Sequence, residues 1–106
     1  MANVTERAWG HYIDHLRTDE CVFKTLYIGP GEGTSAQLHH HRREHWIVTA
    51  GEGVMHYRGN TVRVGVGSEA TIEKKDPHWI KNTGDITLVV REMQTGYCSE
   101  DDIERF

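Results

Sequence analysis

Short β-rich segments separated by glycine turns constrain the fold of this chain more than any other feature of the sequence. The longest are residues 21–28 (CVFKTLYI) and 86–94 (ITLVVREMQ), whose β-branched and aromatic residues favour strands. Eleven glycines punctuate the chain and leave no room for long elements. Further short strands are expected at 35–41, 45–50, 54–57, 61–64, 70–73 and 79–82. Many closely spaced strands predict an all-β sandwich or barrel.

Helical signal is confined to the C-terminus. Ser99 precedes three acidic residues, and a serine cap followed by acids is typical of a helix start, so one short helical turn is expected there. A chain of 106 residues has the size of one domain, so we expect a single domain over 1–106.

Charge and composition exclude several classes of partner. Twelve basic against sixteen acidic residues give a net charge of −4, which disfavours nucleic-acid binding. No apolar run approaches the roughly 20 residues of a membrane span, and residues 1–10 do not resemble a signal peptide. Two cysteines, Cys21 and Cys98, are too few for a disulfide framework. We therefore expect a cytoplasmic protein without a nucleic-acid or membrane partner.

Histidines are concentrated in one internal segment, since four of the eight lie between residues 39 and 45. On a strand, Gln37, His39 and His41 share one face, so the two imidazoles can converge on one ion. A following acid or histidine supplies a third ligand, and a distant histidine a fourth. Imidazole and carboxylate ligands suit a divalent metal such as Zn, Mn, Fe or Ni. Because the cluster is internal and lies between strand signals, we favour a metal site over a histidine-rich surface loop.

Two motifs in this region resemble those of the cupins. Gly33-x5-His39-x-His41-x2-Glu44-x6-Gly51 resembles the first cupin motif, and residues 67–82, with His78-x3-Asn82, resemble the second. This likeness implies a cupin, a double-stranded β-helix or jelly-roll barrel.

A closer resemblance covers nearly the whole chain. Residues 37–46 (QLHHHRREHW) resemble the C-terminal cupin domain of type II mannose-6-phosphate isomerases. That family usually fuses the domain to a GDP-mannose pyrophosphorylase domain. Residues 7–10 (RAWG), 92–97 (EMQTGY) and 100–106 (EDDIERF) resemble the segments that open and close the domain.

The resemblance implies a set of metal ligands. They are His39, His41, Glu44 and His78, with Gln37 as the next candidate.

The third ligand is open between two residues. An unbroken strand from His41 would turn His45 inward, whereas the family pattern nominates Glu44 and requires a turn at residues 42–43. If Glu44 points inward, so does Trp46, which either lines the cavity or belongs to the core. We expect Gln37 and Trp46 to contact the substrate.

The same resemblance implies aldose–ketose isomerisation of a sugar or sugar phosphate. One face of the predicted strand should point inward, because it carries Ile86, Leu88 and Val90. Glu92 lies on the same face and is therefore the candidate general base, or else part of a structural ion pair.

Small barrels of this type commonly pair through a sheet edge, so a homodimer is expected. Two alternatives are another metal-dependent cupin enzyme (an epimerase, lyase or dioxygenase) and a non-catalytic module that binds sugar or metal.

Two departures from the family pattern leave the small-molecule substrate open. The sequence has no nucleotidyltransferase segment, so we do not expect it to synthesise GDP-mannose. Glu73-Lys74-Lys75 stands where the family's second motif has Pro-x-Gly, so the loop before His78 has changed. The spacing of the lysines and arginines does not by itself predict a phosphate-binding site.

Overall fold

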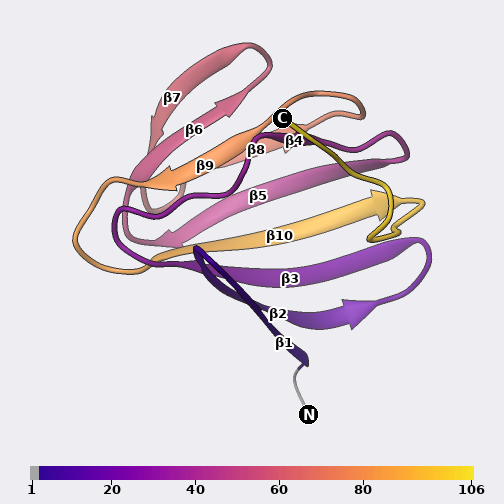
Figure 1. The fold of residues 1–106 in the computed structure, drawn as a ribbon, viewed down its shortest axis with the longest axis horizontal. Helices are drawn as coiled ribbons and strands as arrows, with labels where there is room; N and C mark the ends of the chain where they lie inside the picture. Colours follow the sequence, from indigo (N-terminus) through magenta and orange to yellow (C-terminus); the bar gives the residue numbers. More distant parts are fainter. Residues whose placement is uncertain (1–2) are drawn as a thin grey trace.

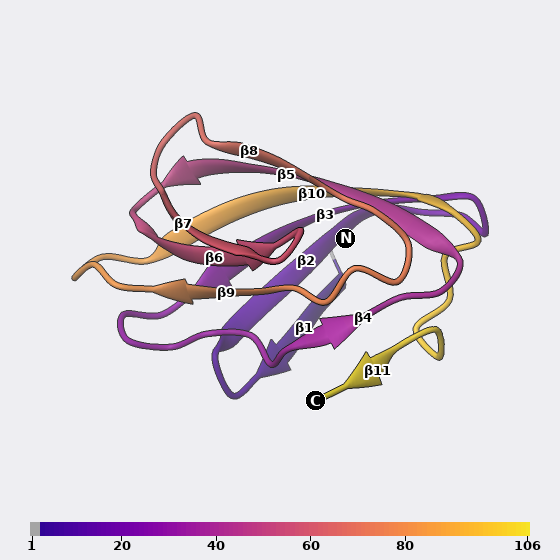
Figure 2. The ribbon, with the colours of Figure 1, turned by 90° about the horizontal axis from the view of Figure 1, so that it is seen from above.

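The computed structural model describes residues 3–106 as two facing layers of antiparallel strands (Figures 1 and 2). The larger layer is a six-stranded sheet in the order β1-β2-β3-β10-β5-β8. Its strands are β1 (Asn3–Arg7), β2 (Gly10–Arg17), β3 (Cys21–Ile28), β10 (Leu88–Gly96), β5 (Arg42–Ala50) and β8 (Glu69–Ile72). The central strand β10 pairs along its length with both β3 and β5.

The second layer is assembled from shorter pieces. It contains a three-stranded sheet, β7-β6-β9, and a two-stranded sheet, β11-β4. These strands are β4 (Gln37–Leu38), β6 (Gly53–Tyr57), β7 (Asn60–Val64), β9 (Trp79–Asn82) and β11 (Glu104–Arg105). Isolated bridges from Gly33 to Lys81 and from Gln37 to His78 join the two pieces. As a result, β4 and β11 lie at the end of the layer where His78 precedes β9.

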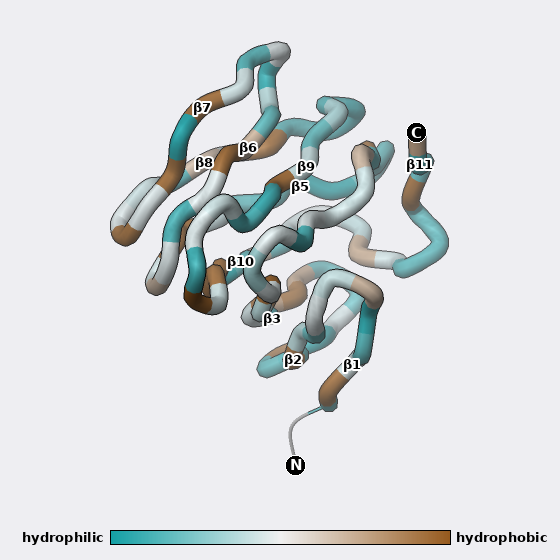
Figure 3. Tube along the Cα trace, turned by 60° about the vertical axis from the view of Figure 1, so that its left-hand side comes forward, coloured by the Kyte–Doolittle hydropathy of each residue, from teal (hydrophilic) through white to brown (hydrophobic). Residues whose placement is uncertain are grey.

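The layers enclose an apolar core because inward and outward residues alternate along each strand. In β10, Leu88 and Val90 are fully buried, while Val89 and Arg91 between and after them are not. Figure 3 shows hydrophobic and hydrophilic residues interspersed along the strands in the same way. The core cluster also contains Leu26, Ile28, Trp46, Val48, Met55, Ile72 and Ile80. Each such side chain contributes roughly 1.5–3 kcal/mol by its burial.

Most strands lie where the sequence predicts them, and the exceptions have physical causes. β3 and β9 coincide with the predicted 21–28 and 79–82. β1 and β2 were not predicted, because polar residues dominate these strands at the edge of the sheet. The inward face predicted for Ile86 was wrong: β10 begins two residues later, and Ile86 is 60% exposed.

The predicted C-terminal helical turn is not formed as a helix. The chain turns sharply, with Asp102 N donating to Ser99 O at 3.1 Å and Ile103 N donating to Asp101 O at 3.0 Å, and it then enters β11. Pairing of Glu104 and Arg105 with β4 extends the backbone immediately after this turn. No helix within residues 3–106 is long and apolar enough to cross a membrane.

The altered loop at residues 73–75 retains the conformation that a glycine would favour. Lys75 has φ +65°, and its N–H donates to His39 O at 2.7 Å. A left-handed conformation costs a residue with a Cβ about 1–2 kcal/mol. The lysine therefore occupies a strained backbone position beside a histidine of the cluster.

Replacing Lys75 by glycine should relieve that strain. We expect K75G to raise the free energy of unfolding by up to about 1 kcal/mol, after allowing for the greater flexibility of glycine in the unfolded chain. The matched control is K74G, at the neighbouring exposed position, where no positive φ occurs and glycine should destabilise. Urea unfolding of the three proteins checks this, and equal effects of the two substitutions would contradict it.

Candidate metal centre

A sharp corner at residues 39–41 decides which side chains reach the interior. β4 ends at Leu38, β5 begins at Arg42, and the backbone bends at His40 and His41. The carboxylate of Asp102 holds this bend, because His40 N donates to its Oδ1 at 2.9 Å and His41 N to its Oδ2 at 2.8 Å. The turn that the family pattern requires is therefore present, but it lies slightly earlier than the predicted 42–43.

The glycine at the end of β10 allows the corner to pack closely. Gly96 pairs with Arg42 and has φ +111°. A Cβ at this position would lie 2.6 Å from His41 O, closer than non-bonded atoms approach. Only glycine fits here without moving the corner.

The corner turns Glu44 inward and His45 outward. Glu44 is 2% exposed, whereas the exposed His45 places its Nε2 2.9 Å from Glu69 Oε1 on the outer face. The prediction that an unbroken strand would turn His45 inward is therefore wrong, because the chain bends before β5 begins.

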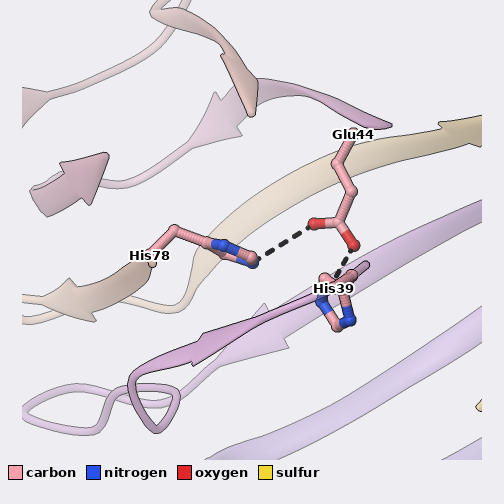
Figure 4. A group of neighbouring side chains, drawn as sticks. All are labelled: His39, Glu44 and His78. Carbon is pink, nitrogen blue, oxygen red and sulfur yellow. Dashed lines mark ion pairs between the residues drawn. The ribbon is translucent and has the colours of Figure 1, made fainter. Parts of the chain in front are cut away.

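Three of the side chains predicted as ligands are brought together, and one is not. His39, Glu44 and His78 are buried, and each offers a ligand atom within 4.8 Å of the others. His39 Nε2 lies 3.3 Å from Glu44 Oε2, and His78 Nε2 lies 3.5 Å from Glu44 Oε1 (Figure 4). His41 is exposed, and its ring faces that of Tyr97 with centroids 6.2 Å apart. The expected convergence of His39 and His41 is not observed, because they lie on opposite sides of the bend.

Backbone carbonyls orient both buried imidazoles. His39 Nδ1 lies 2.7 Å from Asp102 O, and His78 Nδ1 lies 2.9 Å from Asp76 O. A carbonyl oxygen only accepts, so each Nδ1 carries a proton and, in the neutral ring, Nε2 keeps its lone pair. His78 Nε2 is buried and has no hydrogen-bond partner in residues 3–106. An unpartnered nitrogen facing a carboxylate fits a metal ligand.

The electrostatics favour an ionised carboxylate at the centre of the cluster. Burial alone would raise the pKa of Glu44, but the close approach of His78 and the attraction of Arg42 and His39 outweigh it and hold that pKa far below its usual value. For His39, burial is the main influence and lowers the pKa, despite the attraction of Glu44. The cluster therefore combines an anionic oxygen ligand with a neutral imidazole.

A buried arginine completes the surroundings of Glu44. Arg42 Nε donates to Glu44 Oε2 at 2.9 Å, and Arg42 Nη2 lies 3.1 Å from His39 Nε2. The other carboxylate oxygen accepts from Trp46 Nε1 at 3.0 Å. A metal bound by His39 Nε2 would require Arg42 to release that nitrogen, because one lone pair cannot serve both.

Glu44 of this cluster lines a cavity of about 450 Å³, whereas His39 and His78 lie behind the cavity wall. Gln37, Trp46 and Glu92 all line it, as the sequence predicts. Gln37 exchanges two backbone hydrogen bonds with His78, so their side chains lie on the same side of the strand pair. Trp46 serves both of its predicted roles, because it lines the cavity and also belongs to the core.

Glu92 is a buried carboxyl group in the wall of this cavity. It is 4% exposed, and its Oε2 accepts from Gln94 Nε2 at 2.6 Å. Burial, together with repulsion from Glu44, raises the pKa of Glu92 to about 7. A carboxyl group with such a pKa can take up and release a proton near neutral pH.

Sequence reasoning missed two residues of the site. Asp102 was interpreted as part of a helix start, and Arg42 as part of a turn. Their roles depend on contacts with distant or bent segments, which strand periodicity does not reveal. The only available signal for Asp102 was the similarity of residues 100–106 to the family's closing segment.

Comparison with known proteins identifies the family of this chain. The sequence profile of the family described as "Mannose-6-phosphate isomerase C-terminal" matches residues 1–106. The chain belongs to this family. It is 38% identical over 101 residues to the mannose-1-phosphate guanylyltransferase of Escherichia coli K12, covering 94% of this chain and 21% of that protein. It is also 37% identical over 101 residues to the alginate biosynthesis protein AlgA of Pseudomonas putida, with the same coverage. The chain thus spans about a fifth of the length of these relatives.

This chain shares its cupin fold with more distant proteins of known structure. The capsular polysaccharide assembling protein CapF of Staphylococcus aureus superposes with a TM-score of 0.84 at 19% identity, over 100% of this chain and 34% of that one. The cupin domain of Cnp3 from Schizosaccharomyces pombe gives a TM-score of 0.78 at 10% identity, over 89% of this chain and 68% of that one. The predicted cupin fold is confirmed.

Replacing one carboxylate oxygen of Asp102 should destabilise the bend at His40 and His41. We expect D102N to lower the free energy of unfolding by about 2 kcal/mol, because an amide nitrogen cannot accept from a backbone N–H. D101N, at the adjacent exposed residue, is the control. Thermal and urea unfolding of both variants check the effect, and equal stability of the two would contradict the role of Asp102.

The buried Glu92 should make stability depend on pH. Its pKa is about 7 in the folded protein against 4.5 for an ordinary Glu, so between these values the folded state binds the extra proton. The free energy of unfolding should therefore fall as pH rises through this window. The advantage of E92Q over the wild type should grow there by on the order of 3 kcal/mol. Urea unfolding of metal-free proteins at several pH values tests this, and parallel pH curves would disprove it.

Proposed function

We propose that this domain is a divalent-metal-dependent aldose–ketose isomerase acting on a sugar phosphate such as mannose 6-phosphate. The observation that carries the proposal is a buried carboxyl group of raised pKa, Glu92, in a cavity that is also lined by Glu44 of the His–Glu–His cluster. Membership of a family described by mannose-6-phosphate isomerase supports this choice of reaction. The homodimer and the cytoplasmic location remain predictions.

The ligand donors suit a single divalent cation. His39, Glu44 and His78 would hold it, and Gln37 is the candidate for a fourth ligand in place of His41. Gln37 qualifies because it is paired with His78 and lines the cavity. Imidazole nitrogens and carboxylate or amide oxygens are compatible with Zn, Mn, Fe or Ni. The carbonyl groups of Asp102 and Asp76 keep both imidazoles oriented toward the ion.

In the proposed reaction, the protein residues position the sugar and move one proton. When bound, the metal would polarise the sugar's carbonyl oxygen and its neighbouring hydroxyl. Glu92, in its ionised form, takes the proton from C2 and returns it to C1, while the proton of the C2 hydroxyl passes to the C1 oxygen, so that the aldose becomes a ketose. A pKa near 7 suits both halves of this transfer, because the group exchanges the proton at little cost. Burial of Glu92 and Trp46 limits exchange of that proton with water.

The direct test is conversion of mannose 6-phosphate to fructose 6-phosphate by purified protein supplied with Zn, Mn, Fe, Ni or Co. We expect turnover with at least one metal and its loss on chelation. Absence of turnover with all five would overturn the proposal.

Metal content should distinguish the histidines inside the cluster from the one outside it. We expect H39A and H78A each to lose the ion, because each removes a buried ligand nitrogen. H41A is the matched control and should keep it, because that imidazole is exposed. Elemental analysis after dialysis measures the outcome. Loss of metal in H41A but not in H39A would contradict the ligand set.

Glu92 should affect catalysis without affecting the metal. We expect E92Q to lower kcat by at least about 100-fold while keeping the wild-type metal content, because the amide cannot accept the proton. E69Q, on the outer face, serves as the control. Coupled turnover assays check this, and an E92Q variant with normal kcat would eliminate Glu92 as the base.

A further inference from the structure

A buried ammonium group faces the same cavity and lacks a hydrogen-bonding partner. Lys24, on β3, is 5% exposed and lines the cavity. Within residues 3–106 its Nζ makes no hydrogen bond, and its nearest carboxylate oxygens are Glu100 Oε1 at 3.7 Å and Asp14 Oδ1 at 4.0 Å. It also lies over the Tyr12 ring, whose centroid is 4.1 Å from Nζ. Burying an ammonium without hydrogen bonds is costly, which points to a partner that enters from the cavity.

Arg17 already engages the two carboxylates near Lys24. Arg17 Nη2 lies 2.6 Å from Glu100 Oε1, and Arg17 Nε and Nη2 each lie 3.2 Å from Asp14 Oδ2. These contacts are shorter than those of Lys24. Arg17 therefore binds Glu100 and the Oδ2 atom of Asp14, whereas Asp14 Oδ1 has no hydrogen-bond partner within residues 3–106 and lies 4.0 Å from Lys24 Nζ. Neither acid is within hydrogen-bond distance of the ammonium, which leaves its donors available to a ligand.

A second cationic side chain, that of Arg7, also lies near the Tyr12 ring. The Arg7 guanidinium carbon lies 5.5 Å from the Tyr12 centroid, and Arg7 also lines the cavity. Its contacts are a long hydrogen bond of 3.5 Å to the Tyr12 hydroxyl and one to Glu6 O; the described residues give it no ion pair with a carboxylate. Both cations therefore adjoin Tyr12 and the cavity, and neither has a hydrogen bond to a carboxylate that would compete with an anionic ligand.

The sheet register relates this pair of cations to the metal ligands. Glu92 lies between Trp46 of β5 and Lys24 of β3 in one cross-strand row, and Gln94 pairs with Glu44 in the next row. Across the sheet, the proposed metal ligand Glu44 on β5 is therefore followed by the proposed base Glu92 on β10 and then by the cation Lys24 on β3. Two strand spacings separate β5 from β3, roughly 10 Å. An open-chain hexose phosphate can extend over such a distance.

We propose that Lys24 and Arg7 bind the phosphate group of the substrate while its carbonyl end lies at the His39–Glu44–His78 cluster. This assignment rests on the proposed function for the nature of the substrate. It adds the residues that select a phosphorylated sugar and the direction in which the sugar lies. Lys24 supplies a desolvated charge, and Arg7 supplies a guanidinium suited to two phosphate oxygens.

The test measures binding apart from catalysis. Metal-free wild-type, K24M and R7M proteins are titrated with mannose 6-phosphate, inorganic phosphate and mannose by calorimetry. Methionine keeps the length of the side chain without its charge. We expect each variant to bind mannose 6-phosphate and inorganic phosphate roughly 10- to 100-fold more weakly, with binding of mannose unchanged. K74M, which removes an exposed cation outside the cavity, should resemble the wild type.

Two outcomes separate this inference from the proposed function. If both K24M and R7M bind the phosphorylated ligands as well as wild type does, the phosphate assignment is overturned even if isomerisation occurs. If the wild type shows no isomerisation but its phosphate binding depends on Lys24 and Arg7, the assignment stands and the reaction is overturned. Should K24M fail to fold, as judged by circular dichroism, the exposed Arg7 decides the question through R7M.

Discussion

The arrangement of the site depends on one carboxylate that joins the end of the chain to the bend between β4 and β5. Asp102 accepts from the backbone N–H groups of His40 and His41, and its own carbonyl accepts from His39 Nδ1. A single residue therefore fixes both the direction of the backbone and the orientation of a ligand imidazole. The pairing of β11 with β4 holds Asp102 in place, so the closing segment forms part of the site.

The consequence of this bend is that a charged residue enters the interior. Glu44 is buried at the layer interface, where an isolated carboxylate would be strongly unfavourable. Arg42 and Trp46 each donate to it, and two imidazole nitrogens approach it within 3.5 Å. A centre of this kind can exchange one cation for another, because the carboxylate requires positive charge from either the guanidinium or a metal.

The six-stranded sheet places the other polar side chains of the cavity on neighbouring strands, through the pairing of β3, β10 and β5. β10 carries apolar residues at its beginning and then Glu92 and Gln94 on the same face, so the core gives way to a polar cavity along a single strand. Its neighbours β5 and β3 place Glu44 and Lys24 on opposite sides of that polar stretch. The register of antiparallel strands thus places the carboxylate of the His39–Glu44–His78 cluster, a buried carboxyl group of raised pKa and a buried lysine on three neighbouring strands.

Local sequence was sufficient for the all-β class, most strand positions and the cavity face of Glu92, because strand periodicity and glycine turns are short-range signals. Family resemblance added His39, Glu44 and His78. Only the tertiary structure showed that His41 lies outside the cluster, since a bend held by a residue sixty positions away reverses the face on which a histidine lies. It also revealed Asp102 and the Lys24–Arg7 pair, whose partners lie on other segments, and Arg42, which contacts His39 across the bend. Hydrogen bonds and charges across strands depend on register and closure, and no periodicity within one segment encodes them.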